Sequence, residues 1–240
     1  MKKFILGLCL LALSTGNVVA QSTYSELNVQ TEYITEVKSS KDALFINAQT
    51  WANANTTERN VSVETSDKGT GTLILKASSK LPRKDGINDY SVINVQMNVK
   101  IDCRDGKYRV TYSNFTSTVQ PDRTIDVQYL GTSSLQSMIK ELKAVEKLAD
   151  GFGKEVYWGY DKIVSAKHKY LEQNKRYKDE IAALDANSKK GKKEIKWKNR
   201  WIEENEVYIN YLDYILKGFE CAITDFQASI GKAMNVSDDF

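Results

Sequence analysis

The first half of the chain alternates apolar and polar residues with a period of two. The clearest case is residues 93–103, where every second position is apolar and the positions between are polar. This period is typical of a strand that buries one face in an antiparallel sheet. Shorter segments with strand character lie at residues 33–37, 61–63, 73–75 and 108–112. Turn sequences at residues 67–69 and 104–107 are expected to join neighbouring strands into hairpins.

One helix is expected to interrupt these strands. Ser40 is a suitable N-cap, and Asp42 follows in the first turn, where a negative charge is favourable. Apolar residues then recur at helical spacing, at Leu44, Phe45, Ala48, Trp51 and Ala52. This order of elements predicts an α+β fold in which a helix packs on one face of an antiparallel sheet.

After residue 129 the apolar period lengthens to about 3.5, which is typical of helices. Ser133 and Gln136 form a candidate capping box for a first helix, and Gly151 is a natural end for it. Two longer helices follow, with coiled-coil-like heptad seams in residues 156–184 and 195–230.

The two long helices are expected to form an antiparallel hairpin, because only a short turn sequence at residues 187–191 separates them. Folding the chain about that turn places Asn174 opposite Asn205. This is the shared polar layer of the two seams, and two facing amides can satisfy each other and fix the register.

The N-terminus reads as a secretory signal. Lys2 and Lys3 precede a short apolar run at residues 4–13, and small or apolar residues lead to Ala20. We therefore expect residues 1–20 to be a cleaved signal peptide, 21–130 an α+β domain, and 131–240 a helical region. The mature chain would begin at Gln21 and be periplasmic, envelope-associated or extracellular. No other apolar run approaches the ~18 residues of a membrane-spanning helix, so no transmembrane segment is expected.

Charge matters only locally in this chain. The formal net charge of +3 falls to about +1 without Lys2 and Lys3, so the whole protein gives no reason to expect nucleic-acid binding. One basic and aromatic cluster is the candidate binding patch, and it comprises Lys189, Lys190, Lys192, Lys193, Lys196, Trp197, Lys198, Arg200 and Trp201. The simpler interpretation is a solvated hairpin tip whose tryptophans pack on the adjacent helix. The functional alternative is an anionic partner bound by the cations and tryptophans together.

No catalytic motif is present. His168 is the single histidine and is expected on a solvated helix face, so neither a triad nor a zinc site is predicted. Cys103 and Cys221 are the mature cysteines, and we favour two separate thiols over one disulfide. The loop and strand-end acids lack the spacing of a calcium loop; they are Asp102, Asp105, Asp122 and Asp126. We expect no cofactor and no enzyme activity, with a hydrolase that uses scattered carboxylates as the alternative.

The region from Val37 to Val119 resembles a domain-of-unknown-function family with a TBP-like fold, found in secreted proteins of Bacteroidota. The resemblance rests on residues 41–45, the following Trp51, residues 69–71 and residues 104–109. It implies a curved antiparallel sheet with a packed helix, in an envelope protein. It brings no catalytic residues, and a TBP-like topology does not itself imply DNA binding.

Together these observations predict an exported, non-catalytic binding or scaffold module of the cell envelope. It would offer the open face of the sheet or the hairpin surface to a partner, which is an envelope protein or an anionic surface and not nucleic acid.

Overall fold

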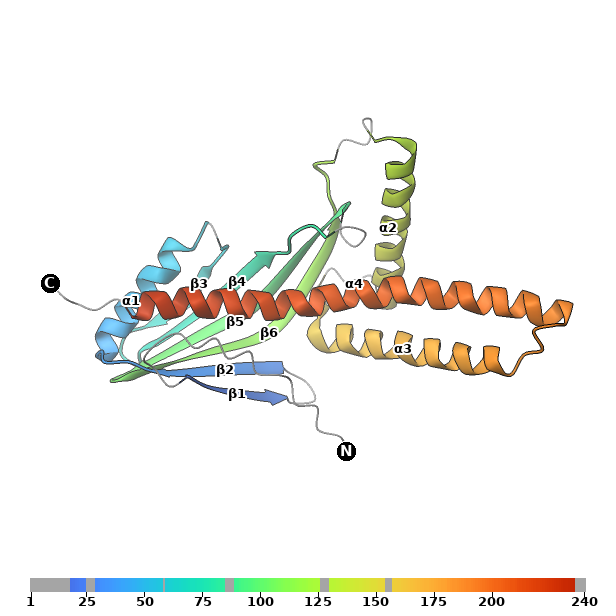
Figure 1. Ribbon diagram of the computed structural model, residues 1–240. Helices are drawn as coiled ribbons and strands as arrows, with labels where there is room; N and C mark the ends of the chain where they lie inside the picture. Colours follow the sequence, from blue (N-terminus) through green and yellow to red (C-terminus); the bar gives the residue numbers. More distant parts are fainter. Residues whose placement is uncertain are drawn as a thin grey trace.

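The computed structural model describes residues 18–24, 29–57, 59–84, 89–125, 130–153 and 157–235. One open antiparallel sheet has the strand order β1-β2-β6-β5-β4-β3, and β7 pairs with β6 beside this path (Figure 1). The strands are β1 (Val18–Tyr24), β2 (Val29–Glu36), β3 (Ser62–Asp67), β4 (Thr72–Lys80), β5 (Ser91–Arg104), β6 (Lys107–Pro121) and β7 (Trp158–Gly159). Residues 18–20 of the predicted signal peptide begin β1, and residues 1–17 lie outside the described residues.

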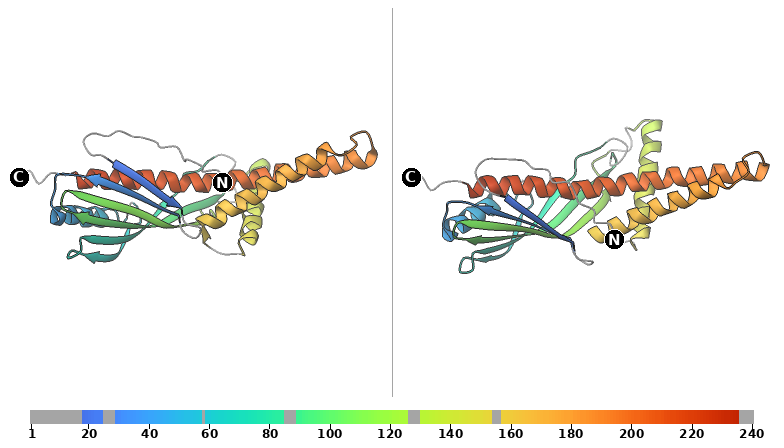
Figure 2. Two further views of the ribbon diagram at one scale, coloured as in Figure 1. Left: turned by 90° about the horizontal axis from the view of Figure 1, so that it is seen from below. Right: turned by 60° about the horizontal axis from the view of Figure 1, so that its bottom comes forward.

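The predicted α+β fold is confirmed by the arrangement of the helices around this sheet. The helices are α1 (Lys41–Ala54), α2 (Thr132–Gly151), α3 (Tyr160–Ala182) and α4 (Lys189–Met234). Helix α1 and the C-terminal half of α4 lie on the same face of the sheet, whereas α3 and the rest of α4 extend beyond it (Figures 1 and 2). None of the described helices combines the length and the apolar character that crossing a bilayer requires.

The alternation in β5 explains why the sheet has two different faces. Its residues alternate strictly between buried and half-buried from Ser91 to Cys103, so one face of the strand belongs to the core. The predicted hairpin to β6 is formed, and Gly106 in its turn has φ of 77°, a left-handed conformation that favours glycine. Within β6, Asn114 also has positive φ, close to the point where the register between β5 and β6 shifts.

Helix α1 follows the sequence prediction closely. The Ser40 Oγ accepts a hydrogen bond from the Ala43 backbone N–H at 3.3 Å, so Ser40 is the N-cap. All five apolar residues of the predicted face are buried, including Trp51. The Trp51 indole N–H donates to Ser229 Oγ of α4 at 2.8 Å, which satisfies this buried donor.

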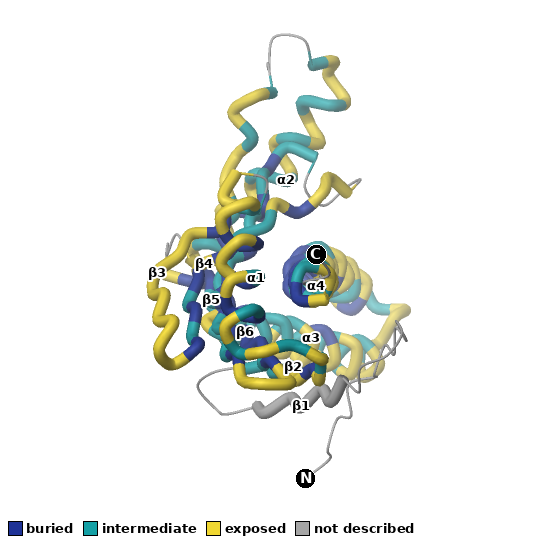
Figure 3. Tube along the Cα trace, turned by 90° about the vertical axis from the view of Figure 1, so that its left-hand side faces the viewer, coloured by how far each residue is buried: buried dark blue, intermediate teal, exposed yellow. Residues whose placement is uncertain are grey.

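Helix α4 shares the core of the sheet. Phe219 is 1% exposed, and its ring lies 5.7 Å from that of Phe115 in β6 and 5.8 Å from that of Tyr160. The Trp51 ring contacts Phe226 of α4 edge-on. Figure 3, which looks along α4, shows its buried side turned towards the sheet. Residues of the predicted α+β domain and of the predicted helical region therefore contribute to one hydrophobic core.

The helical hairpin and its register are confirmed. Helices α3 and α4 are joined at residues 183–188, so the turn predicted at 187–191 was placed too late. Residues 189–191 are already helical, because Ser188 caps α4 by accepting from the Gly191 N–H at 2.9 Å. The Asn205 Nδ2 donates to the Asn174 Oδ1 at 2.9 Å, with both residues buried. The joint also requires Gly191, because a Cβ there would lie 1.9 Å from the Asp185 carbonyl oxygen.

The predicted start of α2 is wrong. Gly131 occupies the N-cap position without a side-chain hydrogen bond, and Ser133 already lies inside the helix. The helix therefore begins two residues earlier than the capping-box pattern predicts. The end at Gly151 agrees with the prediction.

Candidate functional site

The predicted patch lies at the free end of the helical hairpin, where α4 begins (Figure 2). We call its nine residues the tip patch: Lys189, Lys190, Lys192, Lys193, Lys196, Trp197, Lys198, Arg200 and Trp201. Helix α4 has 46 residues and is therefore about 70 Å long at 1.5 Å per residue. Its core contacts with the sheet lie in the C-terminal half, so the tip patch stands well away from the body.

The lysines of the tip patch fall into two groups. Five are exposed and make no ion pair with any described residue, and they are Lys189, Lys190, Lys192, Lys193 and Lys196. Lys198 is different, because it forms an ion pair with Glu180 of α3 and lies 5.6 Å from the centre of the Tyr177 ring. This contact lowers the pKa of Glu180. Lys198 therefore joins the two helices, whereas the other five lysines are free to meet an external anion.

Both tip tryptophans keep a large accessible surface. Trp197 is 46% exposed and Trp201 is 43% exposed. The Trp201 ring packs on Tyr177 of the adjacent helix at 5.4 Å, as the simpler interpretation predicts. The Trp197 ring contacts Arg200 of its own helix at 5.7 Å. One face of the tip thus presents two half-exposed indoles beside unpaired ammonium groups.

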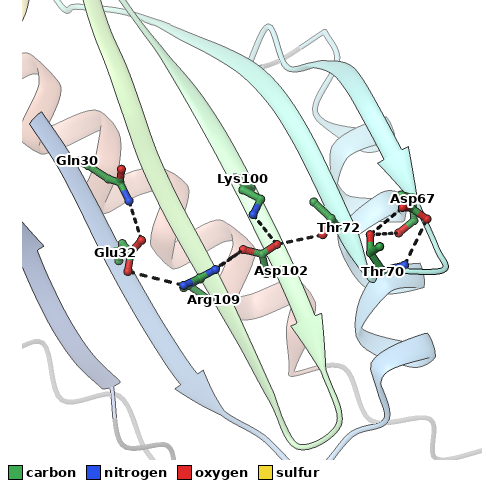
Figure 4. A network of polar contacts seen from close by, with 8 residues as sticks. All are labelled: Gln30, Glu32, Asp67, Thr70, Thr72, Lys100, Asp102 and Arg109. Carbon is green, nitrogen blue, oxygen red and sulfur yellow. Dashed lines mark hydrogen bonds and ion pairs between the residues drawn. The ribbon is translucent and has the colours of Figure 1, made fainter. Parts of the chain in front are cut away.

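A polar row crosses the face of the sheet that is turned away from α4 (Figure 4). The Asp102 carboxylate accepts from Arg109 at 2.8 Å and from the Thr72 hydroxyl at 3.0 Å, and it pairs with Lys100 at 2.9 Å. Arg109 also lies 4.0 Å from Glu32. Burial alone would raise the pKa of Asp102, but these bonds lower it below the usual value. The row joins four strands and neutralises its own charges, so it suits structural support better than ligand binding.

The other acids named from the sequence are also structural or lie outside the described residues. Asp122 accepts from Thr124 and pairs with Arg83, which lowers its pKa to about 2. Asp105 accepts from the Lys41 backbone N–H at 2.8 Å and ties the β5–β6 turn to α1. Asp126 lies outside the described part of the chain. Among the described residues no three His, Cys, Asp or Glu side chains are grouped as metal ligands.

The predicted histidine and cysteines are found as separate groups. His168 is exposed on α3. Cys103 is buried in β5 and Cys221 is exposed on α4, and neither is in a disulfide, which confirms the expectation of two separate thiols. Burial raises the pKa of the Cys103 thiol to about 12, with a further contribution from the Asp102 charge. Cys103 therefore stays a protonated thiol rather than a nucleophilic thiolate.

A cluster around Glu141 was not predicted from the sequence. The Glu141 carboxylate of α2 accepts from the Ser91 hydroxyl at 2.6 Å and from the Tyr90 backbone N–H at 3.1 Å. The Ser91 hydroxyl also shares a 2.6 Å hydrogen bond with the Tyr211 hydroxyl of α4. Ser91 and Tyr211 are each 2% exposed, so a substrate cannot reach them while α2 is docked. The cluster fastens α2 to β5 and α4. The signal in the sequence was Ser91, a polar residue in the apolar phase of β5.

Glu141 gives a prediction about pH. Burial raises the pKa of Glu141 in the folded chain, against the lowering effect of the hydrogen bonds from Ser91 and Tyr90. The folded state then holds the proton more tightly than the unfolded state, so this residue contributes less to stability as pH rises. We expect the free energy of unfolding of the wild type, relative to Glu141→Gln, to fall as the pH rises above the ordinary glutamate pKa of about 4.3. Chemical denaturation at several pH values measures it, with exposed Glu146→Gln as the control. A relative stability that rises over this range would contradict the prediction.

The comparisons with known proteins identify the sheet domain. Residues 31–118 match the family described as "Domain of unknown function (DUF4468) with TBP-like fold", which confirms the resemblance. A DUF4468 family protein from Bacteroides ovatus ATCC 8483 is similar at 14% identity and TM-score 0.36, covering 55% of this chain and 85% of that chain. A TBP-like protein from Parabacteroides distasonis ATCC 8503 is similar at 16% identity and TM-score 0.33, covering 55% and 94%. No curated protein matches the chain. The matched family segment ends in β6, so the hairpin lies beyond it.

Proposed function

We propose that this protein is an exported, non-catalytic binding module of the cell envelope that uses its helical hairpin to reach an anionic partner. The sheet and the packed part of α4 form the rigid body, and the hairpin holds the tip patch at a distance from it. The N-terminal leader supports export, since its basic start, short apolar run and small-residue exit are typical of a cleaved signal.

The observation that carries this proposal is the set of five exposed, unpaired lysines beside two half-exposed tryptophans. Each lysine near an anionic membrane surface contributes on the order of 1 kcal/mol, and indole rings favour the interface between water and lipid. Free lysines at one end of a long hairpin therefore suit a phosphate-bearing or otherwise acidic surface. The polar row on the sheet has no comparable set of unpaired charges.

The carboxylate-dependent hydrolase receives no specific support from the described acids. Glu141 is a carboxyl group with a raised pKa, and the hydroxyls that it bonds are buried. The pKa values of Asp67, Asp102, Asp122, Glu180 and Glu204 are all lowered by hydrogen bonds or ion pairs. Carboxyl groups of this kind stabilise a fold and are poor general acids.

Export is tested by expressing the full chain in a Gram-negative host and sequencing the N-terminus of the protein from the periplasmic fraction. We expect a chain that begins at Gln21. Replacing Lys2, Lys3 and two leucines of the apolar run with glutamate should keep the protein in the cytosol, because the leader then lacks both of its recognition features. A wild-type chain that keeps Met1 and stays in the cytosol would contradict the proposal.

A further inference from the structure

The hairpin has a second surface feature, on the flank away from α2. A shallow groove of about 440 Å³ runs between α3 and α4, and Leu171, Asn174 and Ile209 line it together with charged residues. Helix α2 contacts α4 through Glu204 and Tyr208, by way of Lys147. Residues two apart on a helix are about 200° apart around its axis, so Glu206 of the groove faces away from α2. No described element therefore covers the groove, which α3 and α4 alone line within the described residues.

The two walls of the groove carry opposite charge. Lys175 and Lys178 are exposed on the α3 wall, where Asp179 offsets one of them. Glu206 is exposed on the α4 wall, and exposed Glu203 lies one turn before it on the same side of the helix. None of Lys175, Lys178, Glu203 and Glu206 forms an ion pair within the described residues. Leu171 lies in the same groove and is 45% exposed, so covering its side chain with a partner would be favourable.

We infer that this groove binds a second copy of the chain, with the two hairpins side by side and their tips pointing the same way. A two-fold axis parallel to the hairpin turns the second copy to face the first, and every residue keeps its height along the hairpin. The α3 wall of one copy then meets the α4 wall of the other. The pairing of Asn174 with Asn205 places Lys175 and Lys178 at the height of α4 residues 201–204, within about one turn of Glu203 and Glu206.

The charges select this arrangement over the opposite one. A two-fold axis across the hairpin would place α3 against α3, with lysines opposite lysines, and point the tips apart. In the parallel arrangement the basic wall of each copy meets the acidic wall of the other, so the favourable contact occurs twice in the dimer. Leu171 of each copy enters the groove of the other. The result is a four-helix arrangement that covers the exposed Leu171 side chain of each copy.

The dimer would strengthen the binding of the tip patch to an anionic surface. This consequence rests on the proposed function. Two tip patches side by side would double the number of free lysines that face one anionic surface. Binding of the second patch would then be intramolecular, so the affinity of the dimer for the surface would exceed that of a single tip. The dimer itself depends only on the groove, and it is measured without any anionic surface.

The test is analytical ultracentrifugation of the mature chain together with two charge-reversed variants. We expect the wild type to dimerise, and Lys175→Glu with Lys178→Glu, or Glu203→Lys with Glu206→Lys, to weaken the dimer at least about tenfold by placing like charges together. An equimolar mixture of the two variants should dimerise again, because both walls become complementary. Far-UV circular dichroism confirms that each variant keeps its helices. A wild type that stays monomeric, or variants that dimerise as well alone as in the mixture, would overturn the inference.

The direction of the tips is tested by energy transfer between dyes attached at Asn187→Cys, in a chain with the exposed Cys221 changed to serine. Strong transfer is expected in the dimer, since the tips would be adjacent. A dimer without energy transfer would overturn the parallel arrangement. Each result is independent of vesicle binding, so failure of the dimer is distinguishable from failure of the proposed function.

Discussion

Replacing Asn174 with leucine is expected to lower the free energy of unfolding by about 1–3 kcal/mol. The Asn205 amide is buried, and its Nδ2 donates to Asn174 at 2.9 Å. Its other contact, with the Gln173 side chain at 3.4 Å, is too long to replace that bond. The variant therefore leaves a buried donor unsatisfied, which costs more than the lost hydrogen bond alone.

The double variant distinguishes this cause from simple misfit. With Asn205→Leu added, both polar groups are removed and two leucines face each other in an apolar seam, so much of the lost stability should return. Urea denaturation of the wild type, both single variants and the double variant gives the coupling free energy. Asn210→Leu, an exposed change on the same helix, is the matched control and should shift stability little. Additive single effects would show that the two amides do not depend on each other.

The hairpin was predictable because its signals are local. The heptad spacing indicates which positions of each helix are buried, and the short connection between the helices limits their register, so the pairing of Asn174 with Asn205 could be counted from the sequence although the turn itself was placed a few residues too late. The β5–β6 hairpin was predictable for a similar reason, since alternation and Gly106 lie in one short segment. Helix α1 carried both its cap, Ser40, and its apolar face in the sequence.

The packing of α4 on the sheet was not predictable in the same way. Its heptad seam continues from Ile202 to Ile230 with Asn205 as its polar position, although the first part faces α3 and the second part faces the sheet. Periodicity shows which side of a helix is buried and not what buries it. The Glu141 cluster was missed for the same reason, because Ser91, Glu141 and Tyr211 are brought together only by the tertiary fold. Strand β7 has two residues, too few for any alternation to appear.

The tip patch is expected to bind vesicles that contain anionic lipid, and three charge reversals should abolish this binding. Lys192, Lys193 and Lys196 are exposed and free of ion pairs with described residues. At about 1 kcal/mol for each lysine, losing the three attractions alone weakens binding by at least about a hundredfold at low salt. Reversal to glutamate adds repulsion. The fold should not change, because none of the three side chains belongs to the core.

A matched variant distinguishes the effect of the tip patch on vesicle binding from the effect of the protein's total charge. Lys38, Lys217 and Lys232 are exposed and lie away from the tip, so changing them to glutamate alters the total charge equally. Trp197→Ala with Trp201→Ala should weaken vesicle binding without altering its dependence on salt, since the indoles act through the interface rather than through charge. Attraction through the lysines should fall steeply as salt rises, because the Debye length is about 8 Å at physiological ionic strength.

Sedimentation with anionic vesicles at low salt is the most direct test that the hairpin tip is a binding surface. The account predicts that the wild type and the Lys38, Lys217 and Lys232 variant sediment with these vesicles. It also predicts that the Lys192, Lys193 and Lys196 variant stays in solution, and that vesicles of neutral lipid bind none of the three. A wild type that stays in solution, or a tip variant that sediments as well as the matched variant, would contradict it.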